Sequence, residues 1–164
     1  AGLTYSKYLA KNWRVYSKID GIAGFIINGD MEQDANWTSV FTPEVNERST
    51  TQIHGGNYSR HANDSTPSYG GIFQTFSKVA GKTYNVSFWY YLVSGTLQYY
   101  ARNGDDSGYL VGDIHFTTTG SWQQYTGSIT EAVTGVLGGI YFRNYSNADP
   151  AEFYIDDVSV IVAP

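Results

Sequence analysis

The 164-residue sequence predicts an all-β fold, a two-sheet antiparallel β-sandwich, and three observations support that prediction. Aromatic residues make up 16% of the chain and charged residues only 15%, a composition typical of strands with polar, uncharged surfaces. Short alternating apolar runs are separated by turns at fairly even intervals, which predicts eight to ten strands. No strong helical pattern follows residue 20, so the sheets should be antiparallel, and the length fits one domain.

The N-terminal residues 1–23 differ from the rest of the chain. Tyr5, Leu9, Trp13 and Tyr16 recur at helical spacing, and several lysine and arginine residues lie among them. This pattern predicts a short amphipathic helix in an N-terminal arm or linker, left from a longer protein or used for oligomerisation. The sandwich itself is expected over residues 24–164.

The strands of the sandwich follow in order after the apolar run at 25–27 and the Asn28-Gly29 turn. The segment 84–92 gives the clearest pattern, because Tyr84, Val86, Phe88, Tyr90 and Leu92 alternate with more polar residues. The remaining expected strands are two within 36–53, then 69–77, 96–102, 109–117, 122–130, 136–145 and 152–161.

Composition also argues against several classes of function. The chain has no cysteine, which excludes disulfides, thiol catalysis and sulfur-ligated metals. Its formal net charge of −5 and the lack of a basic stripe argue against nucleic-acid binding. No apolar run approaches the roughly 20 residues of a membrane span, so no membrane insertion is expected.

Alternation along three strands predicts an aromatic surface on the outside of a sheet. If Val86 and Phe88 face the core, Trp89 and Tyr91 face outward. The same argument directs outward six further residues: Gln98, Tyr100, Arg102, Tyr141, Arg143 and Tyr145. Aromatic rings stack on the C–H faces of sugars while arginine and glutamine bond hydroxyls, so one shared face of this kind suits a neutral or acidic glycan. Burial of the rings by a protein partner, or simple solvent contact, are the alternatives.

Two adjacent carboxylates, Asp156 and Asp157, interrupt the last strand. Neighbouring strand residues point to opposite faces, so one carboxylate should point inward or toward a neighbouring loop. It then needs a cation, an arginine or a set of backbone amides as its partner. A second acidic segment lies near the start, at 28–32, and could share a partner with this pair. Ca²⁺ is the simplest candidate for that partner.

Five segments together resemble a known family: 28–32 (Asn-Gly-Asp-Met-Glu), 56–59, 81–89, the lone Trp122, and the closing Ile-Asp-Asp-Val at 155–158. In order and spacing they resemble jelly-roll carbohydrate-binding modules of the xylan- and β-glucan-binding type, whose skeleton also occurs in phage virion and tail proteins. The resemblance covers residues 24–162. It implies an extracellular, non-catalytic module that docks on a polysaccharide or cell-surface glycan, as part of a larger enzyme or a virion assembly.

The resemblance also implies a structural Ca²⁺ that ties the first strand to the last. Its ligands would be Glu32 and either Asp156 or Asp157, with backbone carbonyls from the loop at Gly55 or Asn57. Asp30 would either join this set or only cap its own turn. His54-Gly55-Gly56 departs from the usual loop pattern of the family.

Two alternatives to a glycan-binding module remain open. Short matches to jelly-roll alginate lyases would assign proton abstraction and carboxylate neutralisation to Arg48, Gln52, His54 and Tyr145. The chain is short for that fold, and its Asp-Asp-Val ending does not belong to it. The other alternative is a structural or interaction domain of a larger assembly, which would use the same aromatic face to bind protein.

Overall fold

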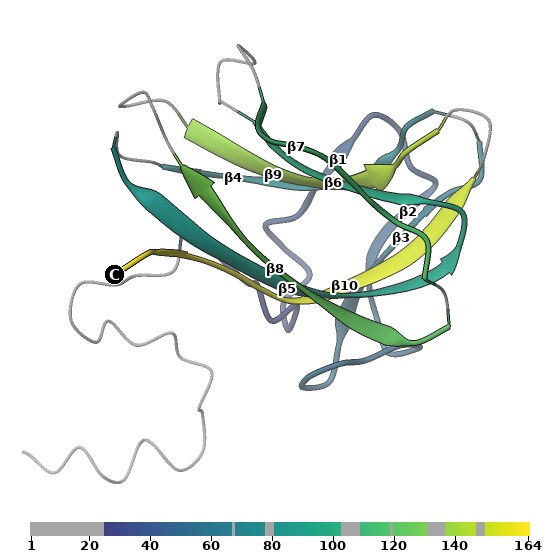
Figure 1. Ribbon diagram of the computed structural model, residues 1–164. Helices are drawn as coiled ribbons and strands as arrows, with labels where there is room; N and C mark the ends of the chain where they lie inside the picture. Colours follow the sequence, from purple (N-terminus) through teal and green to yellow (C-terminus); the bar gives the residue numbers. More distant parts are fainter. Residues whose placement is uncertain are drawn as a thin grey trace, which may run out of the picture.

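The computed structural model describes residues 25–66, 68–77, 81–102, 109–118, 120–130, 137–146 and 150–164. They form ten strands in two five-stranded sheets that face each other, which confirms the predicted two-sheet sandwich (Figure 1). Every described strand pair is antiparallel. The strands are β1 Thr38–Val40, β2 Val45–Ser49, β3 Ser59–Asp64, β4 Gly71–Ser77, β5 Thr83–Ser94, β6 Leu97–Arg102, β7 Tyr109–Phe116, β8 Trp122–Thr130, β9 Leu137–Asn144 and β10 Ala151–Val162.

The strand order within each sheet is that of a jelly roll. Sheet A has the order β1-β4-β9-β6-β7, and sheet B has the order β2-β3-β10-β5-β8. The last strand, β10, therefore lies in the middle of sheet B, between β3 and β5. This central place lets residues near the C-terminus meet loops from the first third of the chain.

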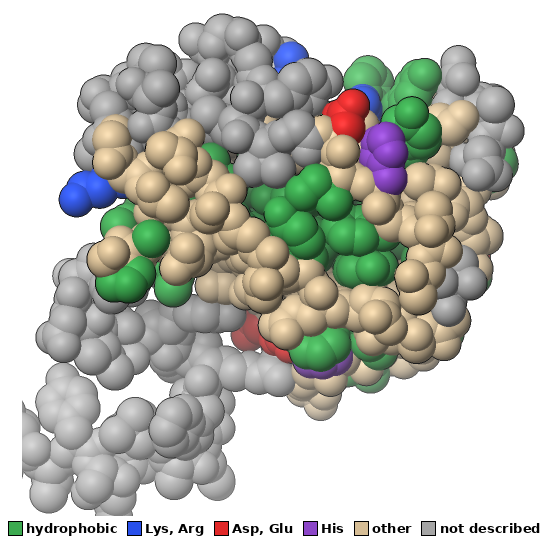
Figure 2. Space-filling view, in the orientation of Figure 1, with side chains coloured by type: hydrophobic (Ala, Val, Ile, Leu, Met, Phe, Trp, Pro, Cys, Tyr) green, Lys and Arg blue, Asp and Glu red, His purple; other side chains and the backbone are tan. Residues whose placement is uncertain are grey.

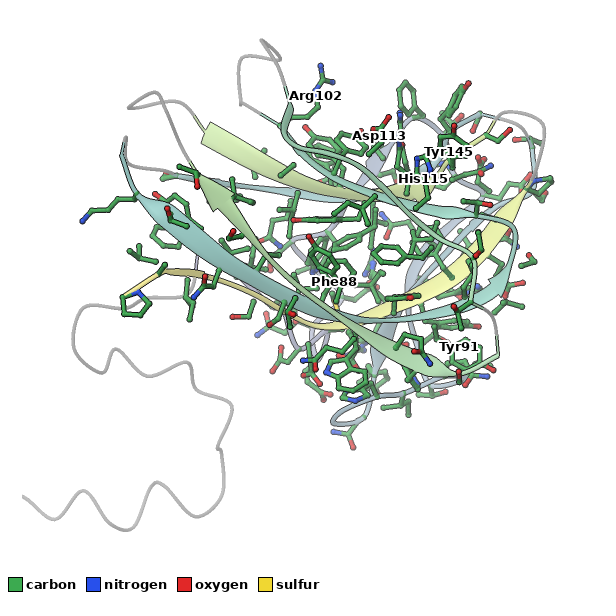
Figure 3. The ribbon with its side chains drawn as sticks, in the orientation of Figure 1. Phe88, Tyr91, Arg102, Asp113, His115 and Tyr145 are labelled. Carbon is green, nitrogen blue, oxygen red and sulfur yellow. The ribbon has the colours of Figure 1, made fainter. Side chains whose placement is uncertain are left out.

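The core lies between the sheets, and β5 supplies one side of it. Tyr84, Val86, Phe88, Tyr90 and Leu92 are all buried, as the alternation along this strand predicts. The Phe88 ring lies between the sheets (Figure 3), 4.9 Å from the ring of Tyr99 and 4.7 Å from that of Phe142. Both of these partners belong to sheet A, so aromatic packing holds the two layers together.

The polar strand β3 is the element that sequence reasoning did not predict. Its sequence, Ser-Arg-His-Ala-Asn-Asp, shows little apolar alternation, yet most of its residues are buried. Arg60 donates to Asp34 at 2.6 Å and to the Asn46 side chain at 2.6 Å. Asp64 accepts from the backbone amide of Gly70 at 2.8 Å. Because partners from other segments satisfy these groups, the strand tolerates burial that its sequence alone does not suggest.

The start of the described chain runs beside the last strand. The amide of Phe25 donates to the carbonyl of Val160 at 2.9 Å, although 25–28 form bends rather than a strand. The expected arm, residues 1–23, lies outside the described residues. Among the residues that the structure describes, no helix is long and apolar enough to cross a membrane.

Candidate functional site

An aromatic ladder crosses the outer face of sheet A. Phe73 on β4 is the register partner of Tyr141 on β9, which is in turn the partner of Tyr100 on β6. The Phe73 and Tyr141 rings stack with centroids 5.1 Å apart, and Tyr141 and Tyr100 stack at 4.7 Å. Both pairs are 6° from parallel. Three neighbouring strands thus hold one rigid row of rings.

Polar side chains continue this face beside the ladder. The Nε of Arg143 donates to the Oε1 of Gln98, and the Nε2 of Gln98 donates to Asp113 at 2.8 Å. The guanidinium carbon of Arg143 lies 4.8 Å from the centre of the Tyr100 ring and 5.2 Å from that of Tyr69. Hydrogen bonds and cation–π contacts together fix the orientation of this arginine.

Exposed rings border the same face. Phe41 is 57% exposed and Tyr145 is 43% exposed, and the Tyr145 ring lies 3.8 Å from that of His115. Arg102, Asp113, His115 and Tyr145 all project outward from sheet A (Figure 3). Hydrophobic, acidic and histidine side chains also gather on this side of the molecule in Figure 2. The face therefore combines apolar rings with hydrogen-bonding groups, as sugar recognition requires.

The prediction of one shared aromatic surface is wrong for Trp89 and Tyr91. Both point outward, as the alternation predicts, but β5 belongs to sheet B while β6 and β9 belong to sheet A. Figure 3 shows Tyr91 on the side of the molecule opposite Arg102 and Tyr145. The chain changes sheets within the short turn at Gly95, where φ is +75°, and alternation along a strand carries no information about such a change. The other six residues lie on the outer side of sheet A: Gln98, Tyr100, Arg102, Tyr141, Arg143 and Tyr145. Gln98 and Tyr100 are nevertheless buried there, each only 2% exposed.

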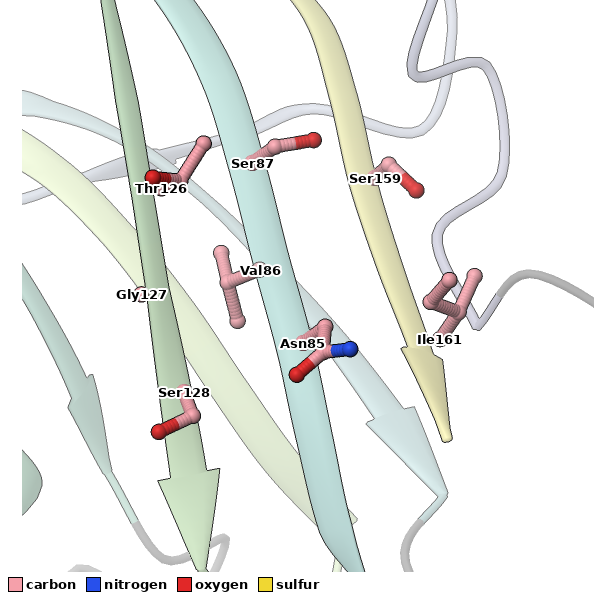
Figure 4. A pocket seen from close by; sticks show the side chains of 8 residues that line it. All are labelled: Asn85, Val86, Ser87, Thr126, Gly127, Ser128, Ser159 and Ile161. Atoms are coloured by element: carbon pink, nitrogen blue, oxygen red, sulfur yellow. The ribbon is translucent and has the colours of Figure 1, made fainter. Parts of the chain in front are cut away.

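Trp89 and Tyr91 belong to a second aromatic cluster, on the outer face of sheet B. His54 stacks on Trp89 at 3.8 Å, and Trp122 packs against Tyr91 at 5.8 Å. His54 covers one face of the indole, so a sugar cannot stack there. A shallow hollow of about 440 Å³ lies farther along this face (Figure 4). It is lined without any aromatic ring, by Asn85, Val86, Ser87, Thr126, Gly127, Ser128, Ser159 and Ile161. Aromatic rings therefore lie on the outer sides of both sheets.

Two carboxylates from opposite ends of the chain meet at the loop 54–58. Glu32 accepts from the Asn57 amide at 2.7 Å and from the Asn57 side-chain nitrogen at 3.0 Å. Asp156 accepts from the backbone amides of His54 at 3.2 Å and Gly55 at 3.0 Å. The predicted connection between the acidic segment at 28–32 and the last strand is thus made through this loop. Backbone amides are thus among the partners of the inward carboxylate.

The two aspartates of the last strand have different surroundings. Asp156 is fully buried, and desolvation raises the pKa of its carboxyl to about 7 despite the amide hydrogen bonds. Asp157 follows at a register shift with φ +48°, and its carboxylate lies 2.9 Å from the Nδ1 of His54. Both carboxylates thus contact the loop, but Asp156 is the buried one and accepts from its backbone, whereas Asp157 pairs with the side chain of His54. Asp30 is half-buried in the turn that the Met31 amide closes on the Asn28 carbonyl, at 3.3 Å.

These residues suit Ca²⁺ by their chemistry, since they offer hard oxygen donors around one loop. Asp156 has no lysine or arginine partner within the described residues, and its raised pKa reports an uncompensated buried charge. No group of three or more acidic, histidine or cysteine side chains converges among the described residues. Glu32 and Asp156 would therefore need backbone carbonyls or water to complete the coordination of an ion.

The residues considered for lyase chemistry are not brought together. His54 lies on the outer side of sheet B, where it stacks on Trp89, whereas Tyr145 lies at the end of β9 in sheet A. Arg48 donates to the carbonyl of Glu32 at 2.8 Å and covers the ring of Tyr58. The two candidate bases therefore lie on opposite sides of the sandwich, and the guanidinium of Arg48 is already engaged by Glu32 and Tyr58.

The strand order and the two facing sheets define a jelly-roll β-sandwich. Residues 23–143 match the family model CBM_4_9, described as a carbohydrate binding domain. The chain therefore belongs to this family, and the resemblance found in its sequence motifs is confirmed.

Individual relatives agree with this assignment. The chain is 38% identical over 120 residues to endo-1,4-beta-xylanase A of Thermoanaerobacterium saccharolyticum, a match covering 66% of this chain and 10% of that enzyme. The C-terminal family 22 carbohydrate binding module of Clostridium thermocellum Xyn10B superimposes with a TM-score of 0.68 at 18% identity, covering 85% of this chain and 94% of that one. Tailspike protein 4 of bacteriophage CBA120 shares the fold, with a TM-score of 0.66 at 15% identity, covering 85% of this chain and 21% of that one.

Proposed function

We propose that this chain is a non-catalytic module that docks on a polysaccharide through the outer face of sheet A. The observation that carries the proposal is the aromatic ladder of Phe73, Tyr141 and Tyr100, with Arg143 and Gln98 held beside it. Phe73 and Tyr141 are partly exposed and supply apolar contact to sugar C–H groups, and the half-buried Arg143 bonds hydroxyls. Tyr100 and Gln98 are each only 2% exposed and hold these side chains in place from below. No catalytic pair is needed for this role.

The proposed ligand is the neutral main chain of a β-1,4-linked plant polysaccharide such as xylan. The support is the 38% identity to part of an endo-1,4-beta-xylanase. The chain spans only a tenth of that enzyme, so we propose that it acts as one module of a larger extracellular protein, which holds a catalytic domain near the polymer.

We further propose that the module holds one structural Ca²⁺ through Glu32 and Asp156. The support is their convergence on the loop 54–58 and the buried charge of Asp156. The ion would neutralise that carboxylate and join the first turn to the last strand. It would serve stability and would take no part in chemistry.

The proposal is tested by isothermal titration of the folded chain with soluble xylan, mixed-linkage β-glucan and dextran. Binding to xylan at micromolar to millimolar concentration, with little binding to dextran, is expected for a surface of this kind. The solution mass is measured in parallel, because a face buried in an obligate protein interface gives a stable oligomer. A stable oligomer that binds none of the three polymers would instead support an interaction domain.

A further inference from the structure

Arg143 is the basic group held at the centre of the polar part of the sheet A outer face. It is half-buried on β9, and its guanidinium carbon lies within 5.6 Å of the ring centres of Phe41, Tyr69 and Tyr100. Its Nε is engaged with Gln98. The guanidinium is thus positioned by its surroundings before any ligand arrives, which lowers the entropy cost of binding.

The two terminal amino groups of this guanidinium have no acceptor among the described residues, since the bond to Gln98 is the only hydrogen bond that Arg143 makes there. The carboxylate of Asp113 accepts from the Nε2 of Gln98 at 2.8 Å, and among the described residues it forms no ion pair with Arg143. Gln98 therefore separates the two charges. The face offers two parallel N–H donors and an unneutralised positive charge, next to exposed rings.

A ligand that carries only hydroxyls would leave this charge uncompensated. A carboxylate matches the planar fork of a guanidinium with two parallel hydrogen bonds, which a hydroxyl cannot do. We propose that Arg143 binds the carboxylate of a uronic acid carried as a side branch on the polysaccharide that sheet A binds. This inference rests on the proposed function and narrows its ligand to an acidic, branched polysaccharide.

The test compares two polymers that differ only in the acid. One is glucuronoxylan, and the other is the same preparation after chemical reduction of its uronic carboxyl groups to primary alcohols. Main chain, branching and polymer length are then unchanged. The wild-type chain should bind the acidic polymer about tenfold more tightly, the size of a charge-assisted bidentate contact at a partly exposed site. This preference should shrink as sodium chloride is raised from about 0.05 M to 0.5 M.

Three variants separate the roles of charge and shape. Arg143→Gln should bind both polymers alike, at the affinity of the wild-type chain for the reduced one. Arg143→Lys keeps the charge without the fork and should keep only part of the preference. Lys82→Gln removes the same charge from an exposed turn before β5 and should keep the full preference. Thermal unfolding of each variant verifies that it is folded. If Arg143→Gln does not fold, the loss of preference in Arg143→Lys tests the inference in its place.

The outcomes distinguish this inference from the proposed function beneath it. Equal wild-type affinity for the two polymers would overturn the role of Arg143 and leave polysaccharide binding intact. So would an Arg143→Gln variant that still prefers the acidic polymer. Binding of neither polymer by the wild-type chain would overturn the proposed function and this inference with it.

Discussion

The carbonyl of Gly29 accepts a hydrogen bond of 2.8 Å from the amide of Val158 and so joins the first described turn to the last strand. The approach is close, because a Cβ placed on Gly29 would lie 2.0 Å from the carbonyl oxygen of Val158. Only glycine fits there without moving backbone. Gly29 and Val158 are close in sequence to Glu32 and Asp156, respectively. Their hydrogen bond therefore helps to position the two carboxylates of the proposed ion site.

Gly29→Ala should therefore destabilise the fold by more than about 2 kcal/mol, since backbone must shift to admit the methyl group. Gly81→Ala is the control: its φ is +70°, but a Cβ there meets nothing within 4 Å, so only about 1–2 kcal/mol of backbone strain is expected. Urea unfolding of both variants measures the difference. A Gly29→Ala variant no less stable than Gly81→Ala would contradict the close approach.

Calcium should raise the melting temperature of the wild-type chain relative to a sample in EDTA. Free Ca²⁺ at one hundred times its dissociation constant adds about 2.7 kcal/mol to the free energy of unfolding. Magnesium should have much less effect, because it demands a tighter octahedral shell. Asp156→Asn should abolish the calcium response, while Glu47→Gln, at an exposed carboxylate on β2, should keep it. Equal melting temperatures in calcium and EDTA would contradict the proposed calcium site.

Without calcium, the stability of the chain should fall as pH rises from about 4 to about 7. The pKa of Asp156 is about 7 in the folded state against 3.8 in the unfolded state, so the folded state binds more protons within this window. The contribution of this carboxyl is on the order of a few kcal/mol.

Urea unfolding in EDTA at pH 5 and pH 7.5 measures this slope. Asp156→Asn should flatten it, because the amide does not titrate in this range. Saturating calcium should flatten it as well, since the ion favours the charged carboxylate. A wild-type slope that Asp156→Asn leaves unchanged would assign the pH dependence to other groups.

Tyr141→Ala should weaken polysaccharide binding by about 1–3 kcal/mol without unfolding the domain, since it removes the middle ring of the ladder. Tyr91→Ala is the matched control, because this half-buried tyrosine lies on the outer face of sheet B. Titration with xylan, supported by circular dichroism of both variants, compares the two. If Tyr91→Ala lost affinity and Tyr141→Ala did not, the binding face would be on sheet B instead.

Sequence reasoning predicted most of the fold because the fold depends on local patterns. The alternation of Tyr84 through Leu92 predicted correctly which side of β5 is buried. The strand β3 was missed because its polar residues are buried against partners from distant segments, such as Asp34 with Arg60. A burial that depends on long-range hydrogen bonds leaves no apolar period in the sequence.

For the candidate site, the sequence predicted correctly that these side chains point outward, but it predicted wrongly that all of them share one surface. The six residues on β6, on β9 and just after β9 lie on the outer side of sheet A, but Trp89 and Tyr91 lie on the opposite side of the molecule. Strand alternation specifies only inside or outside. The outer face on which a side chain lies depends on the sheet that its strand joins. Pairing between strands far apart in sequence decides which sheet that is.

The sequence by itself determined the class of fold, the inward and outward sides of its clearest strands, and the convergence of the acidic segment at 28–32 with the last strand. The first two follow from local periodicity and turn chemistry, which act over a few residues, whereas the third was implied by the resemblance to carbohydrate-binding modules. Only the tertiary structure decided that Phe73 completes a ladder with Tyr141 and Tyr100, and that Gln98 separates Arg143 from Asp113. Those relationships depend on the register of strands that are far apart in the sequence, such as β4 and β9, and register is fixed by packing of the whole sandwich.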